Sequence, residues 1–132
     1  YTPLANPNRQ IRLLTIRAEK ENDVELRCYL KTFESINDAP PYRALSYLWG
    51  KDDGEWKPKI SLNKKNFEVG TNLHLALEHV GHMTFIGSPE WTGCWWIDAI
   101  CIDQKNPHEK NEQIKIMKNI YENADEVVAW LG

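Results

Sequence analysis

The chain has 132 residues, of which 42% are hydrophobic and 27% charged, with a formal net charge of −3. This length fits a single domain over residues 1–132, and the apolar fraction excludes a disordered chain because enough surface can be buried. The near-neutral charge argues against a nucleic-acid binder, and no apolar run reaches the roughly 18 residues of a membrane span. The 3 cysteines form no CxxC pair. That usage is typical of reduced thiols and predicts a cytoplasmic protein.

The first half of the chain predicts short strands joined by polar turns, followed by one helix. Consecutive prolines mark residues 37–41 as a loop. Apolar spacing predicts a helix that is capped by Thr71 or Asn72, runs through His79 and stops at Gly81. The strands expected before it, forming two hairpins and one isolated strand, cover residues 11–16, 26–30, 44–49, 60–62 and 67–69.

The second half predicts a strand, a helix and a second strand. Residues 95–102 are almost continuously apolar, which is typical of a strand covered on both faces of a parallel sheet. A loop over residues 103–107, a helix that ends near Asn123, and a buried strand over residues 127–131 follow. This order forms a βαβ unit. The predicted fold class is α/β, with a mostly parallel central sheet flanked by helices and with N-terminal β-hairpin additions.

The start of the last helix contains the candidate catalytic residue, Glu109. Asn106 is a favoured N-cap, Pro107 suits the first helical position, and Glu109 occupies the place of a capping-box carboxylate. Helical spacing turns Glu109 toward the sheet, and ligands of open parallel sheets bind where such helices begin. The free N–H groups there also suit a phosphate. Glu109 therefore either carries chemistry at an open crevice or only accepts the backbone N–H of Asn106.

Two further groups of residues have both a structural and a functional interpretation. Asp98 is the only charge within the apolar run; it either anchors neighbouring loop amides or contacts a ligand, because a buried carboxylate needs partners. Ser46, Tyr47 and Trp49 end a strand just before an acidic loop. Their aromatic rings either stack on a flat ligand or close the core.

The cysteine and histidine residues are weaker candidates for a catalytic or metal-binding role. Cys101 is expected in the middle of a buried strand, which suits an inert thiol better than a nucleophile. His79 and His82, with Cys94 further along, lack the second ligand pair of a typical zinc site. We therefore expect no metal centre.

Two motifs resemble those of the fungal heterokaryon incompatibility (HET) domain. The segment YRALSYLWG at residues 42–50 resembles the opening motif of that domain, and WIDAICIDQ at residues 96–104 resembles its second block, with Asp103 where Asn is commoner. Residues IRLL at 11–14 match the usual lead-in. The second block continues with Asn106, Glu109, Gln113, Met117, Ile120, Tyr121, Ala124 and the closing WLG at 130–132.

The resemblance implies a fungal intracellular module that triggers programmed cell death during non-self recognition. Such a module forms part of a larger receptor or incompatibility protein, works with the other domains of that protein, and self-associates. HET domains are distantly similar to TIR domains, which are flavodoxin-like and of which some cleave NAD. This implies NAD as a possible substrate, with no cofactor required.

The likeness to TIR domains places Glu109 where the essential glutamate of those enzymes lies. An alternative is a non-catalytic oligomerisation module that recruits a downstream death factor. The candidate substrate-binding residues around Glu109 are Ser46, Tyr47, Trp49, Asp98, Asp103, Gln104 and Asn106.

Overall fold

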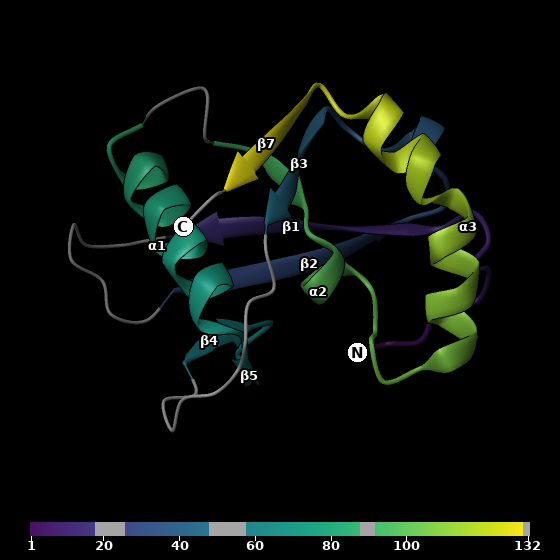
Figure 1. Cartoon of the computed structure of the whole chain (residues 1–132), viewed down its shortest axis with the longest axis horizontal. Coiled ribbons are helices and arrows are strands. Elements are labelled where there is room, and N and C mark those ends of the chain that lie inside the picture. Colours follow the sequence, from purple (N-terminus) through teal and green to yellow (C-terminus); the bar gives the residue numbers. More distant parts are fainter. Residues whose placement is uncertain (18–25, 48–57, 88–91, 131–132) are drawn as a thin grey trace. The chain divides into compact units, whose positions relative to one another are not determined.

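The computed structural model describes residues 1–17, 26–47, 58–87 and 92–130, and these form a mixed α/β structure (Figure 1). Helices α1 (Thr71–Phe85), α2 (Asp98–Cys101) and α3 (Pro107–Asn123) accompany the 3-10 turn η1 (Ile36–Asp38). The strands are β1 (Ile11–Arg17), β2 (Arg27–Phe33), β3 (Tyr42–Tyr47), β4 (Lys59–Leu62), β5 (Lys65–Glu68), β6 (Cys94–Trp96) and β7 (Glu126–Trp130).

The strands form one sheet in the order β5-β4-β2-β1-β6-β3-β7. Strand β2 pairs with β4 in parallel, as does β3 with β6, whereas β4 and β5 are antiparallel. The predicted α/β class is confirmed, with β1 and β2 as neighbours in the sheet. The finer likeness to flavodoxin and TIR domains stays a prediction.

The chain divides into two compact units. The first unit comprises Tyr1–Leu14, Leu30–Leu45 and Cys94–Val128. The second unit comprises Thr15–Tyr29, Ser46–Gly93 and Ala129–Gly132.

The core of the first unit is aliphatic and aromatic. The ring of Trp96 meets that of Tyr121 edge-on, with centroids 5.3 Å apart, a geometry that aromatic pairs favour. The hydroxyl of Tyr42 donates a 2.5 Å hydrogen bond to the carbonyl of Ile120 in α3. The side chains buried in this unit include Ile11, Leu13, Leu14, Leu45, Trp95, Trp96, Ile97, Ile100, Ile102 and Ile120.

The strand expected over residues 95–102 is wrong from Ile97 onward. Strand β6 ends at Trp96, and α2 begins at Asp98 with the N–H of Cys101 donating to the carbonyl of Ile97 at 2.7 Å. An unbroken apolar run does not distinguish a buried strand from a short buried helix, because both exclude polar side chains. The apolar run therefore correctly indicated that these residues are buried, but it misled about whether they form a strand or a helix.

The last strand also differs from the expectation. Strand β7 exists, but it is largely exposed rather than buried, and 48% of the surface of Val127 is accessible. It is the last strand in the sheet order, and an edge strand has a neighbour on one side only.

The two turn residues between β4 and β5 account for the hairpin of the second unit. Asn63 and Lys64 connect β4 to β5 with positive φ angles of 49° and 68°, the backbone that a two-residue turn between antiparallel strands requires. This confirms the second predicted hairpin.

Helix α1 is longer than expected at both ends. Its N-cap is Gly70, not Thr71 or Asn72, and the helix continues through the buried Gly81 to Phe85. Gly87, two residues past the end, has a φ of +75° and provides the left-handed residue that commonly follows a helix. The true stop signal was therefore the second glycine. The helix buries Leu73, His74, Ala76, Leu77, Val80 and Gly81.

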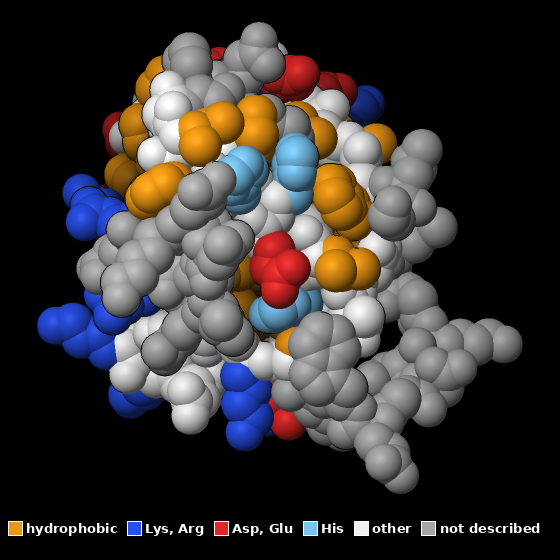
Figure 2. All heavy atoms as spheres, turned by 90° about the vertical axis from the view of Figure 1, so that its left-hand side faces the viewer, with side chains coloured by type: hydrophobic (Ala, Val, Ile, Leu, Met, Phe, Trp, Pro, Cys, Tyr) orange, Lys and Arg blue, Asp and Glu red, His pale blue; other side chains and the backbone are white. Residues whose placement is uncertain are grey.

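The exposed side of α1 mixes histidine, acidic and apolar groups (Figure 2). His74 Nδ1 lies 3.2 Å from Glu78 Oε1, and the ring of His79 packs against Trp130 with centroids 5.5 Å apart. Within the described part of the chain, no cluster of three or more His, Cys, Asp or Glu residues is arranged to hold a metal ion.

Candidate functional site

The start of α3 is built as its sequence predicts. Asn106 is the N-cap, and its Oδ1 accepts the N–H of Glu109 at 3.2 Å, with Pro107 in the first turn. The reciprocal half of the capping box is absent because the N–H of Asn106 donates to the carbonyl of Asp103 instead. The carboxylate of Glu109 is therefore available for other partners.

Those partners are the guanidinium of Arg12 and the backbone of Asp103. Oε1 and Oε2 of Glu109 lie 2.7 and 2.8 Å from the two terminal nitrogens of Arg12. Oε2 also accepts the N–H of Asp103 at 2.5 Å. Two parallel bonds from guanidinium to carboxylate are the strongest arrangement of such a pair. The predicted inward direction of Glu109 is confirmed, but its 1% exposure is not that of a carboxylate at an open crevice.

Arg12 is enclosed by further acceptors in the first unit. Its guanidinium donates to the carbonyls of Cys101 at 3.1 Å and Thr2 at 3.0 Å, and the ring of Tyr1 lies 4.9 Å from its central carbon. The hydroxyl of Tyr1 in turn donates to the carbonyl of Ile100 at 2.7 Å. A buried cation with this many partners is fully compensated.

Sequence reasoning missed Arg12, although a signal was present. It is the single charge in the segment IRLLTI at residues 11–16 of β1, and a lysine or arginine in a strand buried on both faces needs a counter-charge. The sequence around Arg12 did not indicate that the counter-charge is Glu109.

The environment of Glu109 keeps its carboxyl group ionised. Burial raises the pKa, but the hydrogen bonds and charge of Arg12, together with backbone N–H groups, outweigh burial and lower the pKa below its ordinary value. The pKa of Tyr1 is raised, mainly by burial. At neutral pH the carboxylate of Glu109 is therefore negatively charged and forms an ion pair with the guanidinium of Arg12.

Of the predicted substrate-binding residues, four lie with Glu109 in the segment from α2 to the start of α3. Asp98 Oδ1 accepts the N–H of Ala99 at 2.7 Å, and Gln104 donates to the backbone carbonyl of Asp98 at 2.9 Å. The side chain of Asp103 accepts the N–H of Lys105 at 3.1 Å. These contacts, like that of Asn106, fold the connecting loop onto itself.

The remaining predicted residues are not part of this segment of the sequence. Ser46 and Tyr47 end β3 and belong to the second unit. Trp49 lies outside the described residues. The grouping of these three with Glu109 stays a prediction.

Cys101 is buried, as expected, although it lies in α2 and not in a strand. Its Sγ is 3.4 Å from the N–H of Ile97 and 3.8 Å from the carbonyl of Trp95, and the residue is fully buried. A thiol without access to solvent does not act as a nucleophile.

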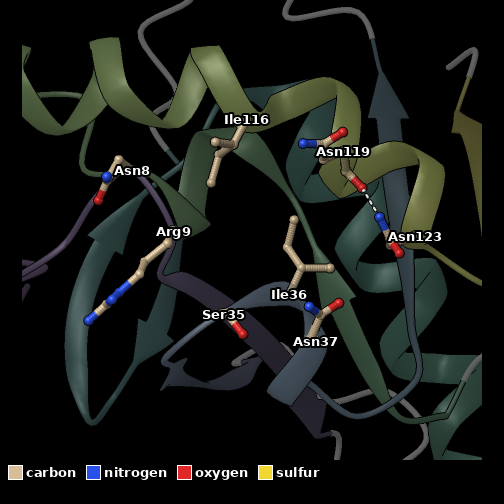
Figure 3. Close-up of a pocket in the computed structure, with 8 residues that line it drawn as sticks. All are labelled: Asn8, Arg9, Ser35, Ile36, Asn37, Ile116, Asn119 and Asn123. Carbon is tan, nitrogen blue, oxygen red and sulfur yellow. Dashed lines mark hydrogen bonds between the residues drawn. The ribbon is translucent and has the colours of Figure 1, made fainter.

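An open hollow of about 270 Å³ lies in the first unit and was not predicted (Figure 3). Three segments distant in sequence form it: the residues before β1, the turn η1, and one face of α3. Its lining residues are Asn8, Arg9, Ser35, Ile36, Asn37, Ile116, Asn119 and Asn123.

The comparisons with known proteins identify the class of this chain. Residues 42–132 match the family model described as heterokaryon incompatibility protein (HET). The chain belongs to that family, as its two motifs predicted. None of the solved structures matches it.

Two named relatives are fungal incompatibility proteins. The chain is 34% identical over 98% of its length to "Heterokaryon incompatibility protein 6, OR allele" of Neurospora crassa, of which it covers 20%. It is 29% identical over 70% of its length to "Vegetative incompatibility protein HET-E-1" of Podospora anserina, of which it covers 6%. The chain thus spans a small part of each relative. None of the described helices is long and apolar enough to cross a bilayer.

Proposed function

We propose that this chain triggers cell death in fungal non-self recognition, as a module of an incompatibility protein. Its family and the names of its two relatives support this proposal. Because the chain covers only 20% and 6% of those relatives, the other domains of the full protein supply recognition of the non-self signal.

We further propose that the module acts by assembly and recruitment and not by a reaction at Glu109. The single observation that supports this choice is the burial of Glu109, whose two carboxylate oxygens bind Arg12 and the N–H of Asp103. A group that contacts a substrate must be reachable by it. The ion pair instead joins β1 to the start of α3, which is a structural role.

The NAD glycohydrolase activity that the likeness to TIR domains implies remains the second candidate. One observation favours it: Glu109 lies in the first turn of α3 and points inward, which is the place that the likeness to TIR domains gives to the essential glutamate. A negative charge stabilises the oxocarbenium-like ribose that forms as nicotinamide leaves NAD, after which water adds to give ADP-ribose. This candidate requires Arg12 and Glu109 to separate when the module is active.

A single experiment distinguishes the two candidates. The module is expressed in fungal cells as a fusion to an inducible dimerisation domain, and both cell viability and total NAD are measured after induction. The variants compared are the wild type, Glu109→Gln, and the double variant Arg12→Met, Glu109→Met. Replacing a buried ion pair by apolar side chains of similar volume often preserves stability, so the double variant separates loss of folding from loss of charge.

The assembly proposal expects death without a fall in NAD, and the double variant kills as efficiently as the wild type. The assembly proposal is contradicted, and catalysis supported, if total NAD falls with the wild type but does not fall with the double variant. The double variant must unfold normally in urea for this comparison to hold. An absence of death in every variant, with the module expressed and dimerised, contradicts the proposed function itself.

A further inference from the structure

The hollow of the first unit has an apolar floor. Ile116 of α3 and Ile36 of η1 are both half-buried, and Figure 3 shows their side chains pointing toward one another. Asn119 and Asn123 follow Ile116 at spacings of three and seven residues, which places all three on one face of α3. The hollow therefore combines a small aliphatic surface with amide groups along the same helix face.

The amide groups around this floor are available to a ligand. Within the described residues, the side chains of Asn8, Asn37 and Asn119 have no hydrogen-bond partner. Asn123 uses its Nδ2 to donate to the backbone carbonyl of Asn119 at 2.8 Å. Each asparagine amide offers donors and an acceptor side by side, which is the complement of a peptide group.

Among the described residues that line the hollow, Arg9 is the charged one. Its guanidinium forms no ion pair with any residue that the structure describes. Figure 3 shows Arg9 and Asn8 on one side of the two isoleucines, and Asn37, Asn119 and Asn123 on the other. None of the described lining residues is a carboxylate; the carboxylate of Asp38, next to the hollow, accepts a 3.2 Å hydrogen bond from the hydroxyl of Ser35. The charge of the lining itself therefore favours an anionic group, and a guanidinium binds a carboxylate through two parallel hydrogen bonds.

We propose that this hollow binds a short extended segment of an acidic peptide. The aliphatic floor accepts a branched apolar side chain, the asparagine amides pair with the main chain of the peptide, and Arg9 binds a carboxylate. A nucleotide is the less suitable occupant because the lining residues that the structure describes include no aromatic side chain on which a base stacks. This site is independent of Glu109, and its test does not rest on the proposed function.

The test is a titration of the 15N-labelled chain with acetyl-Leu-Gly-Asp-amide, followed by amide chemical shifts. The control peptide acetyl-Leu-Gly-Asn-amide has nearly the same shape without the charge. We expect shifts concentrated at residues 8–9, 35–37 and 116–123, a dissociation constant on the order of 1 mM, and binding of the uncharged peptide about threefold weaker or more, as for an exposed ion pair.

Variants separate the roles of the lining residues. Arg9→Gln is expected to abolish the preference for the acidic peptide, and Asn119→Leu to weaken both peptides. Asn111→Leu is the matched control, because Asn111 is also exposed on α3 but does not line the hollow. All three positions are solvent-exposed, so the variants should fold, which a urea unfolding curve verifies.

Three results overturn the proposal. The first is the absence of shifts at the hollow up to about tenfold above the expected dissociation constant. The second is equal binding of both peptides to the wild type. The third is a stronger response of the same residues to adenosine monophosphate, which identifies a nucleotide site instead.

Discussion

Arg12 of β1 donates hydrogen bonds to both carboxylate oxygens of Glu109, a residue 97 positions further along the chain. The side chains of the two residues are 3% and 2% exposed. A pair so completely removed from water stabilises a fold only while both charges are present, because either one alone is a buried, unpaired ion.

The first prediction is that removing one charge of the pair destabilises the fold. Arg12→Met removes the partner of Glu109 and leaves its carboxylate buried, so we expect the free energy of unfolding at pH 7 to fall by about 3–5 kcal/mol. Urea denaturation followed by circular dichroism measures this change. Arg9→Met makes the same chemical change at an exposed position, and it should alter stability by no more than about 0.5 kcal/mol. Similar losses in the two variants contradict the role assigned to the ion pair.

The second prediction is the pH dependence of this contribution. Because the folded-state pKa of Glu109 lies below its ordinary value of 4.5, the ionised carboxylate stabilises the fold fully once the pH is well above 4.5. That stability is lost as the pH falls through the lowered folded-state pKa. We therefore expect the stability advantage of the wild type over Glu109→Gln to be constant above about pH 5.5 and to shrink on further acidification. Urea unfolding at a series of pH values tests it, and an advantage that grows in acid refutes it.

Local features of the fold were readable from the sequence because their causes are local. The cap at Asn106 with Pro107 beside it determines where α3 begins, and the turn at Asn63 and Lys64 joins two neighbouring strands. In each case the residues that make the hydrogen bonds or adopt the unusual φ lie within a few positions of one another. Such features appear in a single short window of sequence.

Features that depend on distant residues were not readable. The partner of Glu109 lies in β1, and the hollow is assembled from segments around residues 8, 36 and 116–123. No local period encodes which strand meets which helix. The α2 error has a different origin, since burial on all sides removes the polar residues that distinguish a helical period from that of a strand. An apolar run therefore indicates burial more reliably than it indicates secondary structure.

The third prediction uses a buried amide in α3. Gln113 is fully buried, and its Nε2 donates to the carbonyls of Pro7 and Gln10 at 2.8 and 2.7 Å. Gln113→Glu replaces this donor by an ionised acceptor of nearly the same shape, so we expect a loss of more than about 2 kcal/mol at pH 7.

Part of that loss should be recovered in acid, because a protonated carboxyl group can again donate to one of the carbonyls. The measurement is the difference in unfolding free energy between Gln113→Glu and wild type at pH 7 and at pH 4.5. The exposed Asn111→Asp on the same helix is the control. A pH-independent difference contradicts the donor role of Gln113.

The fourth prediction separates the cap of α3 from the ion pair that follows it. Asn106→Ala removes the oxygen that accepts the N–H of Glu109, and an N-cap of this kind contributes about 1 kcal/mol. We expect that loss in urea unfolding, with Asn106→Asp close to wild type because its carboxylate accepts the same bond and favours the helix N-terminus. The acid-dependent step described for Glu109 should persist in Asn106→Ala, since Arg12 and the N–H of Asp103 still bind the carboxylate. If the step disappears with the cap, the cap is what holds Glu109 against Arg12, and the two contacts are one structural unit.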